Sequence, residues 1–258
     1  MEICYRLRVA WNGAAYVGWQ RQPEGRSLQA VFEDAVAQLL GQRCVVTASG
    51  RTDAGVHVAE QVLAFRAPVE RAPYALLRGL NATLPKDVVV LSVEVAPPDF
   101  DVRGWVRRKR YRYRVLHRVP RCPFRDGLVF QWRGALSVAD MHAAAQALIG
   151  THDYTSFRAQ GCGARHAVRK IEAASVLAEG DEIHMDVVGN GFLRHQVRII
   201  AGTLLEIGQG KRPVSSMAET LAARHRNAAG PTAAACGLWL MQVELGDGPN
   251  WLEPTDDE

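Results

Sequence analysis

The feature that most limits the fold is an amphipathic helix predicted over residues 28–40, between segments that favour β-strands. Its apolar residues recur at alternating spacings of three and one, as on one helix face that packs against another element. Ser27 suits an N-cap and Gly41 suits a helix end. Strands are predicted over residues 5–11 before the helix, and over residues 44–48 and 61–66 after it.

The rest of the chain continues this mixture of strands and helices. Pro73 begins a short predicted helix through Leu80, Ser137 begins one through Leu148, and the residues from Ser216 cap another. A further helix is predicted over residues 193–207, and the remaining strands are predicted over residues 88–95, 170–177, 182–188 and 238–244. This grouping favours an α+β fold. We expect domains at residues 1–105 and 106–246, with Gly134 as an alternative boundary, followed by an acidic tail at 247–258.

Size and composition are those of an ordinary soluble protein. The 258 residues are 48% hydrophobic and 22% charged, which allows one large domain or two smaller ones. No signal peptide or membrane span is indicated, and the five scattered cysteines favour reduced thiols, so a cytoplasmic location is expected. The tail carries five acids and no Lys or Arg, which makes the rest of the chain more basic than the net charge of +4 suggests.

Residues 109–115 alternate strictly between two kinds of side chain. If they form a strand, Tyr111, Tyr113 and Val115 lie on one face, and arginines lie on the other. This segment belongs to a basic region without any Asp or Glu. Its ten members are Arg103, Arg107, Arg108, Lys109, Arg110, Arg112, Arg114, Arg118, Arg121 and Arg125. Because aromatic residues are interleaved, the region predicts an RNA-binding surface; the alternative is a solvated charged strand.

A loop at residues 48–57 is the best candidate for an active site. Asp53 lies there beside small residues that leave its carboxylate accessible, and Arg51 favours the ionised form. Such a carboxylate can act as a nucleophile without a metal. The alternative is a plain turn, because Asp and Gly favour turns for backbone reasons alone.

Other motifs narrow the function further. On the helix predicted after Leu193, Arg194 and Arg198 would lie on one face and need an anion between them, while His195 is expected in the core. The histidines lack metal-ligand spacing, and neither a phosphate-binding nor a dinucleotide-binding glycine loop is present. These patterns argue against a metal site, ATP use and a nicotinamide cofactor.

Five segments together resemble the TruA family of tRNA pseudouridine synthases. Residues 50–57, GRTDAGVH, resemble its signature loop, and residues 109–113, KRYRY, its tyrosine motif. Three further motifs agree in order and spacing: residues 12–22, 150–158 and 192–198. Two departures are small. Trp11-Asn12-Gly13 stands where the family usually has Tyr-Asp-Gly, and Asp101 follows Phe100 where His is common.

The resemblance implies a fold and a reaction. It implies two similar α+β domains, each an antiparallel sheet with helices on one face, and an RNA-binding cleft between them in a homodimer. It also implies isomerisation of uridine to pseudouridine at positions 38, 39 and 40 of the tRNA anticodon stem-loop, without cofactor or metal. The alternatives are a non-catalytic RNA-binding protein, a pseudouridine synthase acting on other RNA, and a carboxylate-dependent glycosidase.

The same resemblance suggests roles for particular side chains. Asp53 would carry the chemistry, and Arg51 would keep it ionised and fill the space of the extruded nucleotide. Tyr111 would stack on the target uracil and place its hydroxyl for proton transfer, and Arg198 would pair with Asp53. The further substrate-binding candidates within the motifs are Arg21, Gln22, Arg110 and Arg158.

Overall fold

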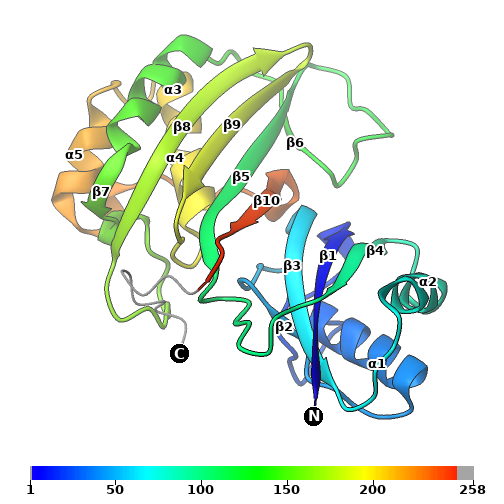
Figure 1. The fold of residues 1–258 in the computed structure, drawn as a ribbon. Helices are drawn as coiled ribbons and strands as arrows, with labels where there is room; N and C mark the ends of the chain where they lie inside the picture. Colours follow the sequence, from blue (N-terminus) through cyan, green and yellow to red (C-terminus); the bar gives the residue numbers. More distant parts are fainter. Residues whose placement is uncertain (1, 249–258) are drawn as a thin grey trace. The chain divides into compact units, whose positions relative to one another are not determined.

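The structure is a computed structural model that describes residues 2–248. It divides into two compact units, residues 2–107 with 240–248, and residues 108–239. Each unit combines helices with β-strands, which confirms the expected α+β class (Figure 1). No helix among these residues is long and apolar enough to cross a membrane.

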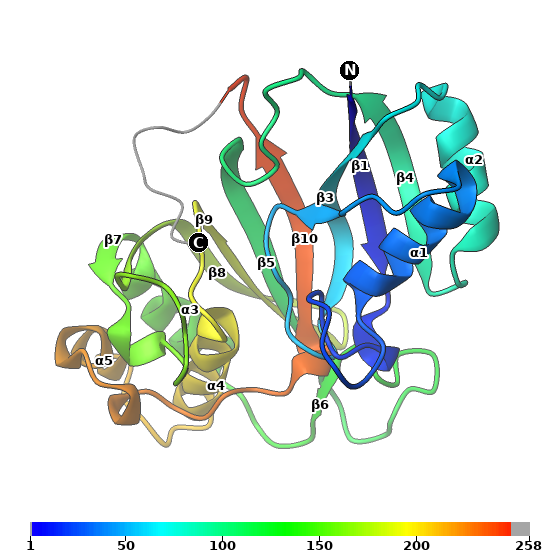
Figure 2. The same cartoon turned by 90° about the horizontal axis from the view of Figure 1, so that it is seen from below.

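The first unit is built on an antiparallel sheet in the order β4-β1-β3. These strands are Val88–Val95, Ile3–Trp11 and His57–Ala67. The short β2 (Thr47–Ala48) pairs with β3, and β10 (Leu238–Leu245) lies on the other side of β3, with its residues from Leu240 in this unit. Helix α2 (Pro73–Thr83) packs on β4 and contacts α1 (Leu28–Leu40) (Figure 2).

The prediction for α1 is confirmed at both ends. The Ser27 side chain accepts a hydrogen bond from the Ala30 amide at 3.3 Å, and Gly41 ends the helix in the left-handed region with φ +76°. The predicted strand over residues 44–48 is shorter than expected. The amide of Val46 donates to the Glu33 carboxylate of α1 at 3.3 Å, so the strand ladder begins only at Thr47.

The second unit contains a sheet in the order β5-β9-β8-β7. These strands are Val106–His117, Glu182–Gly189, Val168–Glu179 and Gly150–Asp153, and they pair antiparallel. The expectation of a purely antiparallel sheet is wrong, because β6 (Phe130–Trp132) pairs parallel with β5 after a long connection. Helix α3 (Val138–Ala145) packs on β8 and contacts both α4 (Gln196–Gly208) and α5 (Ser216–Ala223).

Three helix boundaries in this unit differ from prediction. Helix α4 begins at Gln196 rather than Leu193, because His195 adopts a left-handed conformation with φ +60°. Arg194 therefore precedes the helix and does not share a helix face with Arg198. The predicted Ser216 cap is also wrong: Ser215 occupies the N-cap, and the Ser216 hydroxyl donates to the Pro213 carbonyl at 2.7 Å. Helix α3 ends at Ala145 and continues as a 3-10 turn.

Short 3-10 turns complete the described chain. They are Gly13–Ala15, Gln146–Leu148, Thr155–Phe157, Arg226–Ala228 and Ala235–Gly237.

Candidate active site

Asp53 lies in a loop of the first unit between β2 and β3. Its side chain is half-buried, while Arg51 and Ala54 beside it are exposed. The loop includes a turn in which the Val56 amide donates to the Asp53 carbonyl at 3.2 Å, with Gly55 at φ +77°. The turn alternative from the sequence is therefore correct for the backbone, but it does not exclude the active-site role of the carboxylate.

The segment after β1 holds this loop through backbone hydrogen bonds. The Trp19 amide donates to the Thr52 carbonyl at 3.1 Å, and the Gly55 amide donates to the Tyr16 carbonyl at 3.2 Å. These two bonds bracket Asp53 on both sides. They fix the position of its Cα atom without using its side chain.

Buried side chains hold the end of the loop. The Trp11 indole N–H donates to the Val56 carbonyl at 3.2 Å. His57 is fully buried, and its Nδ1 accepts from the Gly13 amide at 3.1 Å. The histidine of the signature motif is thus a structural anchor between the loop and the turn that follows β1.

A further anchor, Gln61, was missed in the sequence analysis. It is fully buried in β3, donates from Nε2 to the Gly50 carbonyl at 2.9 Å, and accepts from the Ser49 hydroxyl. A buried amide is costly unless its polar atoms are paired, so this arrangement ties the start of the loop to the sheet. The signal in the sequence was a polar residue among the apolar residues of a strand.

The other candidates in the first unit have different surroundings. Arg51 makes no hydrogen bond or ion pair within residues 2–248, so its support of Asp53 stays a prediction. Arg21 pairs with the buried Glu33 at 2.8 Å, and Gln22 donates to the Val17 carbonyl at 3.2 Å. Both of these side chains therefore brace the segment that holds the Asp53 loop.

The second unit contains Tyr111 on β5. The predicted alternation is confirmed, because Tyr111, Tyr113 and Val115 are all buried. The Tyr111 ring packs edge to face on Phe192, with ring centroids 5.0 Å apart and an interplanar angle of 79°. Phe192 precedes α4, so the tyrosine motif and one of the later motifs meet at this contact.

The remaining arginine candidates of the second unit bond to backbone carbonyls. Arg198 is half-buried on α4, and its Nε donates to the Ala233 carbonyl at 2.8 Å. Arg158 donates to the carbonyls of Cys162 and Ala164 at 2.7 and 2.5 Å. These bonds orient both guanidinium groups. The predicted pairing of Arg198 with Asp53 stays a prediction.

The basic face of β5 is neutralised across the sheet, contrary to the prediction of a surface without balancing acids. Arg110 and Arg112 both bond to Asp186, at 3.0 and 2.8 Å, and Arg114 makes two bonds of 2.8 Å to Glu182. Asp186 and Glu182 lie on β9, and Asp186 stands directly opposite Arg112 in the strand register. The acids were separated from the arginines by more than 60 positions in the sequence.

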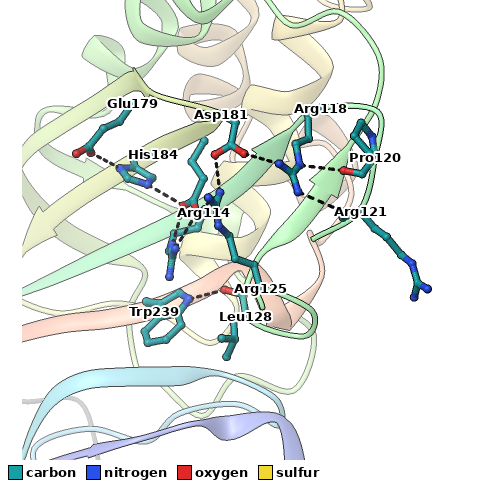
Figure 3. A network of polar contacts seen from close by, with 11 residues as sticks. Arg114, Arg118, Pro120, Arg121, Arg125, Leu128, Glu179, Asp181, His184 and Trp239 are labelled. Atoms are coloured by element: carbon teal, nitrogen blue, oxygen red, sulfur yellow. Dashed lines mark hydrogen bonds and ion pairs between the residues drawn. The ribbon is translucent and has the colours of Figure 1, made fainter. Parts of the chain in front are cut away.

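The loop after β5 is bound to a neighbouring acid, Asp181, which stands just before β9. Arg118 and Arg125 reach Asp181 at 3.1 and 2.5 Å, and the ring nitrogens of His184 each lie 3.0 Å from a carboxylate, that of Glu179 or that of Glu182 (Figure 3). Figure 3 also shows the Arg121 side chain directed away from this network.

The ion pairs alter the pKa values of the acids. Burial raises the pKa of Glu182, but the hydrogen bonds from Arg114 and His184 outweigh burial and lower this pKa to about 2. Burial also raises the pKa of Asp186, and the hydrogen bonds from Arg112 and Arg110 more than reverse this effect. Both carboxylates are therefore ionised at neutral pH and hold the arginines in place.

A second group of cations lies in residues 158–170 and at Arg194. Arg165 and Lys170 are exposed, and neither side chain makes an ion pair in the described part of the chain. Arg194 is also exposed, and its one side-chain hydrogen bond within residues 2–248 goes to the Gly161 carbonyl at 3.4 Å. Residues 158–170 contain no acid. These three side chains keep their charge available to an anionic partner.

The candidate site residues therefore fall into two groups, one in each unit. The first unit holds Asp53, Arg51, Arg21 and Gln22, and the second holds Tyr111, Arg110, Arg158 and Arg198. Among residues 2–248, no three His, Cys, Asp or Glu side chains gather as a metal-binding group.

Comparison with known proteins identifies the family. Residues 9–103 and 144–244 match the sequence profile described as tRNA pseudouridine synthase. The chain is 46% identical over 257 residues to tRNA pseudouridine synthase A of Myxococcus xanthus, an alignment that covers 98% of this chain and 97% of that protein. The chain belongs to the tRNA pseudouridine synthase family. The resemblance to the TruA family is confirmed.

Other relatives agree with this assignment. The chain is 41% identical over 239 residues to tRNA pseudouridine synthase A of Citrifermentans bemidjiense, covering 92% of this chain and 96% of that one. It is 40% identical over 245 residues to the enzyme of the same name from Ralstonia nicotianae, covering 93% and 89%. This tRNA pseudouridine synthase is therefore an isomerase that converts uridine to pseudouridine, and the alternatives of a non-catalytic RNA-binding protein and a glycosidase are excluded.

The two ranges that match the family profile contain some of the candidate site residues but not all of them. Asp53, Arg158 and Arg198 lie within the two matched ranges of the family profile. Tyr111 and Arg110 lie in the interval between these ranges, where the long alignment with the Myxococcus relative continues.

Proposed function

We propose that this synthase isomerises uridines 38, 39 and 40 in the anticodon stem-loop of tRNA, with Asp53 as the catalytic carboxylate. In this reaction the bond from ribose C1′ to N1 breaks, the uracil turns, and a bond from C1′ to C5 forms. The C5 proton leaves, and N1 takes up a proton. Because the product is an isomer of the substrate, the reaction needs no redox partner and no group donor.

The observation that carries this proposal is the support of the Asp53 loop. A half-buried carboxylate is held by backbone hydrogen bonds on both sides and by the buried Gln61 at the start of the loop. A carboxylate fixed in this way can attack the sugar, add to the base, or assist elimination at the sugar. All three routes use the same ionised side chain.

Other residues would prepare the substrate. Exposed Arg51 would occupy the place of the extruded nucleotide, which offsets part of an unstacking cost of a few kcal/mol. Tyr111 would stack on the uracil, and Arg198 would orient Asp53 as an ion-pair partner. Arg110, Arg21, Gln22 and Arg158 would contribute to substrate binding, each from the position described above.

The proposal includes an architecture for RNA binding. Residues 1–105 and 106–246 would form two similar domains, with an RNA-binding cleft between them and a homodimer as the working form. Residues 249–258 of the predicted acidic tail lie outside the described structure. Arg165, Lys170 and Arg194, which have no ion pair among the described residues, would meet tRNA phosphates. Five free cysteines agree with action in the cytoplasm.

Substitution of Asp53 tests the catalytic role. With tRNA labelled with tritium at uridine C5, Asp53→Asn should release tritium at less than about one thousandth of the normal rate, while tRNA affinity stays near normal. Asp34→Asn is the matched control, because Asp34 lies exposed on α1 and pairs weakly with Arg43 at 3.7 Å. Normal turnover by Asp53→Asn would contradict the proposal.

The modified positions need a separate measurement. Chemical derivatisation of pseudouridine followed by sequencing should place the product at positions 38–40 of a purified tRNA. Product at other positions, or on ribosomal RNA alone, would favour the alternative of a synthase with another RNA substrate.

A further inference from the structure

Gly18 brings the backbone of the segment after β1 against the Asp53 loop at Asp53 itself. Its φ is +105°, in the region that L side chains rarely adopt. A Cβ atom built on Gly18 would lie 2.7 Å from the Thr52 carbonyl oxygen and 3.1 Å from both the Asp53 carbonyl carbon and the Ala54 amide nitrogen. These atoms form the main chain immediately before and after the Asp53 side chain.

The backbone of Gly18 is held from the opposite direction by helix α1. The Leu28 amide, at the start of α1, donates to the Gly18 carbonyl at 3.1 Å. The Gln29 amide donates to the carbonyl of Trp19 at 2.9 Å, and Trp19 itself is buried against Trp11 with ring centroids 6.0 Å apart. Gly18 is therefore enclosed between a capped helix and the loop, so an added atom would displace the loop more readily than the helix.

We infer that Gly18 is a positioning residue for Asp53. The missing Cβ allows the backbone at residues 18–19 to contact the main chain of the loop, and this contact sets where the carboxylate stands. The inference rests on the proposed catalytic role of Asp53. It assigns to Gly18 a function in turnover, beside the substrate-binding roles proposed for Arg21 and Gln22 of the same motif, because Gly18 has no side chain with which to contact RNA.

Gly18→Ala tests the inference by adding one methyl group. We expect kcat for tritium release to fall about 100-fold, because a shift of about 1 Å in a reacting group can cost that much. The KM for tRNA and the tRNA affinity should change less than about twofold. A kcat within about twofold of the normal value in a folded Gly18→Ala enzyme would overturn the inference, as would an equal loss of affinity and turnover.

Gly41→Ala is the matched control for backbone strain. Gly41 also has a positive φ, +76°, but a Cβ added there meets no atom within 4 Å. This variant should lose thermal stability as any such substitution does, while kcat stays normal. A fall in kcat for Gly41→Ala equal to that for Gly18→Ala would show that strain alone explains the effect, and the inference would fail.

Ala54→Pro disturbs the same contact between the loop and Gly18, but from the loop side. It provides a second test if Gly18→Ala does not fold. Position 54 is the second residue of the turn, where proline is well accepted, but the proline ring would extend from the nitrogen that faces Gly18. A large loss of kcat with normal tRNA affinity supports the inference, and normal kcat overturns it. Failure of the proposed role of Asp53 is distinguishable, because Asp53→Asn would then keep normal tritium release whatever Gly18→Ala does.

Discussion

Two arginine-rich regions of the second unit, β5 with its following loop and residues 158–170 with Arg194, have similar compositions but different electrostatic environments. On β5, Arg110, Arg112 and Arg114 face the acids of β9 across the sheet. In residues 158–170, Arg158 bonds to backbone carbonyls, and Arg165 has no ion pair among the described residues. Acids of the same unit neutralise arginines of β5 and its following loop, whereas residues 158–170 with Arg194 keep positive charge for a partner.

This difference shows that the number of basic residues in a sequence segment does not give the net charge of the surface that the segment forms. Side chains on a strand alternate between faces, so residues at every second position of β5 and β9 meet across the ladder. Arginines that form forked bonds with buried carboxylates are part of the packing of the sheet. Arg112, Arg114, Arg118 and Arg125 are therefore poorer candidates for RNA contacts than Arg165, Lys170 and Arg194.

Removing a shared acid of β9 should have the largest effect on stability. Asp186→Asn leaves Arg110 and Arg112 without their carboxylate, in a pair where the Asp186 side chain is only 13% exposed. We expect the free energy of unfolding to fall by about 3 kcal/mol, measured by urea unfolding. Glu94→Gln, which breaks the exposed pair with Arg6, should cost less than about 0.5 kcal/mol. Equal costs for the two variants would contradict the conclusion that the ion pairs of β5 are part of the packing of the sheet.

Acid should weaken the β5 network in a defined pH range. The pKa of Glu182 is about 2 in the folded protein and near 4.5 when unperturbed, so its contribution is complete above pH 4.5 and is lost as the pH falls toward 2. The full contribution is on the order of 3 kcal/mol. The difference in unfolding free energy between the unchanged protein and Glu182→Gln should shrink between pH 5 and pH 3. A constant difference would contradict the ion-pair explanation.

The smallest effects are expected for tRNA affinity, and they compare the two regions directly. Arg165→Gln and Arg194→Gln should each weaken tRNA binding and reduce the slope of log affinity against log salt by about one. Arg118→Gln should leave the slope unchanged, because Arg118 is already engaged with Asp181. Titrations at several salt concentrations would measure all three. A reduced slope for Arg118→Gln alone would reverse the assignment of the two regions.

Much of the local structure could be predicted because its causes are local. The alternation of Tyr111, Tyr113 and Val115 correctly indicated one buried face of a strand, since a period of two places such residues together. Ser27 and Gly41 correctly marked the ends of α1, because caps act within one helical turn. The start of α4 was missed, because nothing local in the sequence announced the left-handed conformation of His195.

The candidate site was predictable in its residues but not in its supports. The motif around Asp53 was evident from the sequence, whereas the roles of Gln61, His57 and Gly18 depended on which segments lie against the loop. No spacing rule relates Gly18 to Thr52, because their contact joins segments more than 30 residues apart.

The sequence by itself determined the family and the secondary structure of the longest elements, and it singled out Asp53 as the candidate for the catalytic acid. Only the tertiary structure decided which charges are used within the fold and which backbone holds Asp53. The physical reason is the separation in sequence between the interacting residues. Helix caps and strand alternation depend on neighbours within a few residues, whereas ion pairs across a sheet and close backbone approaches depend on register and packing between distant segments.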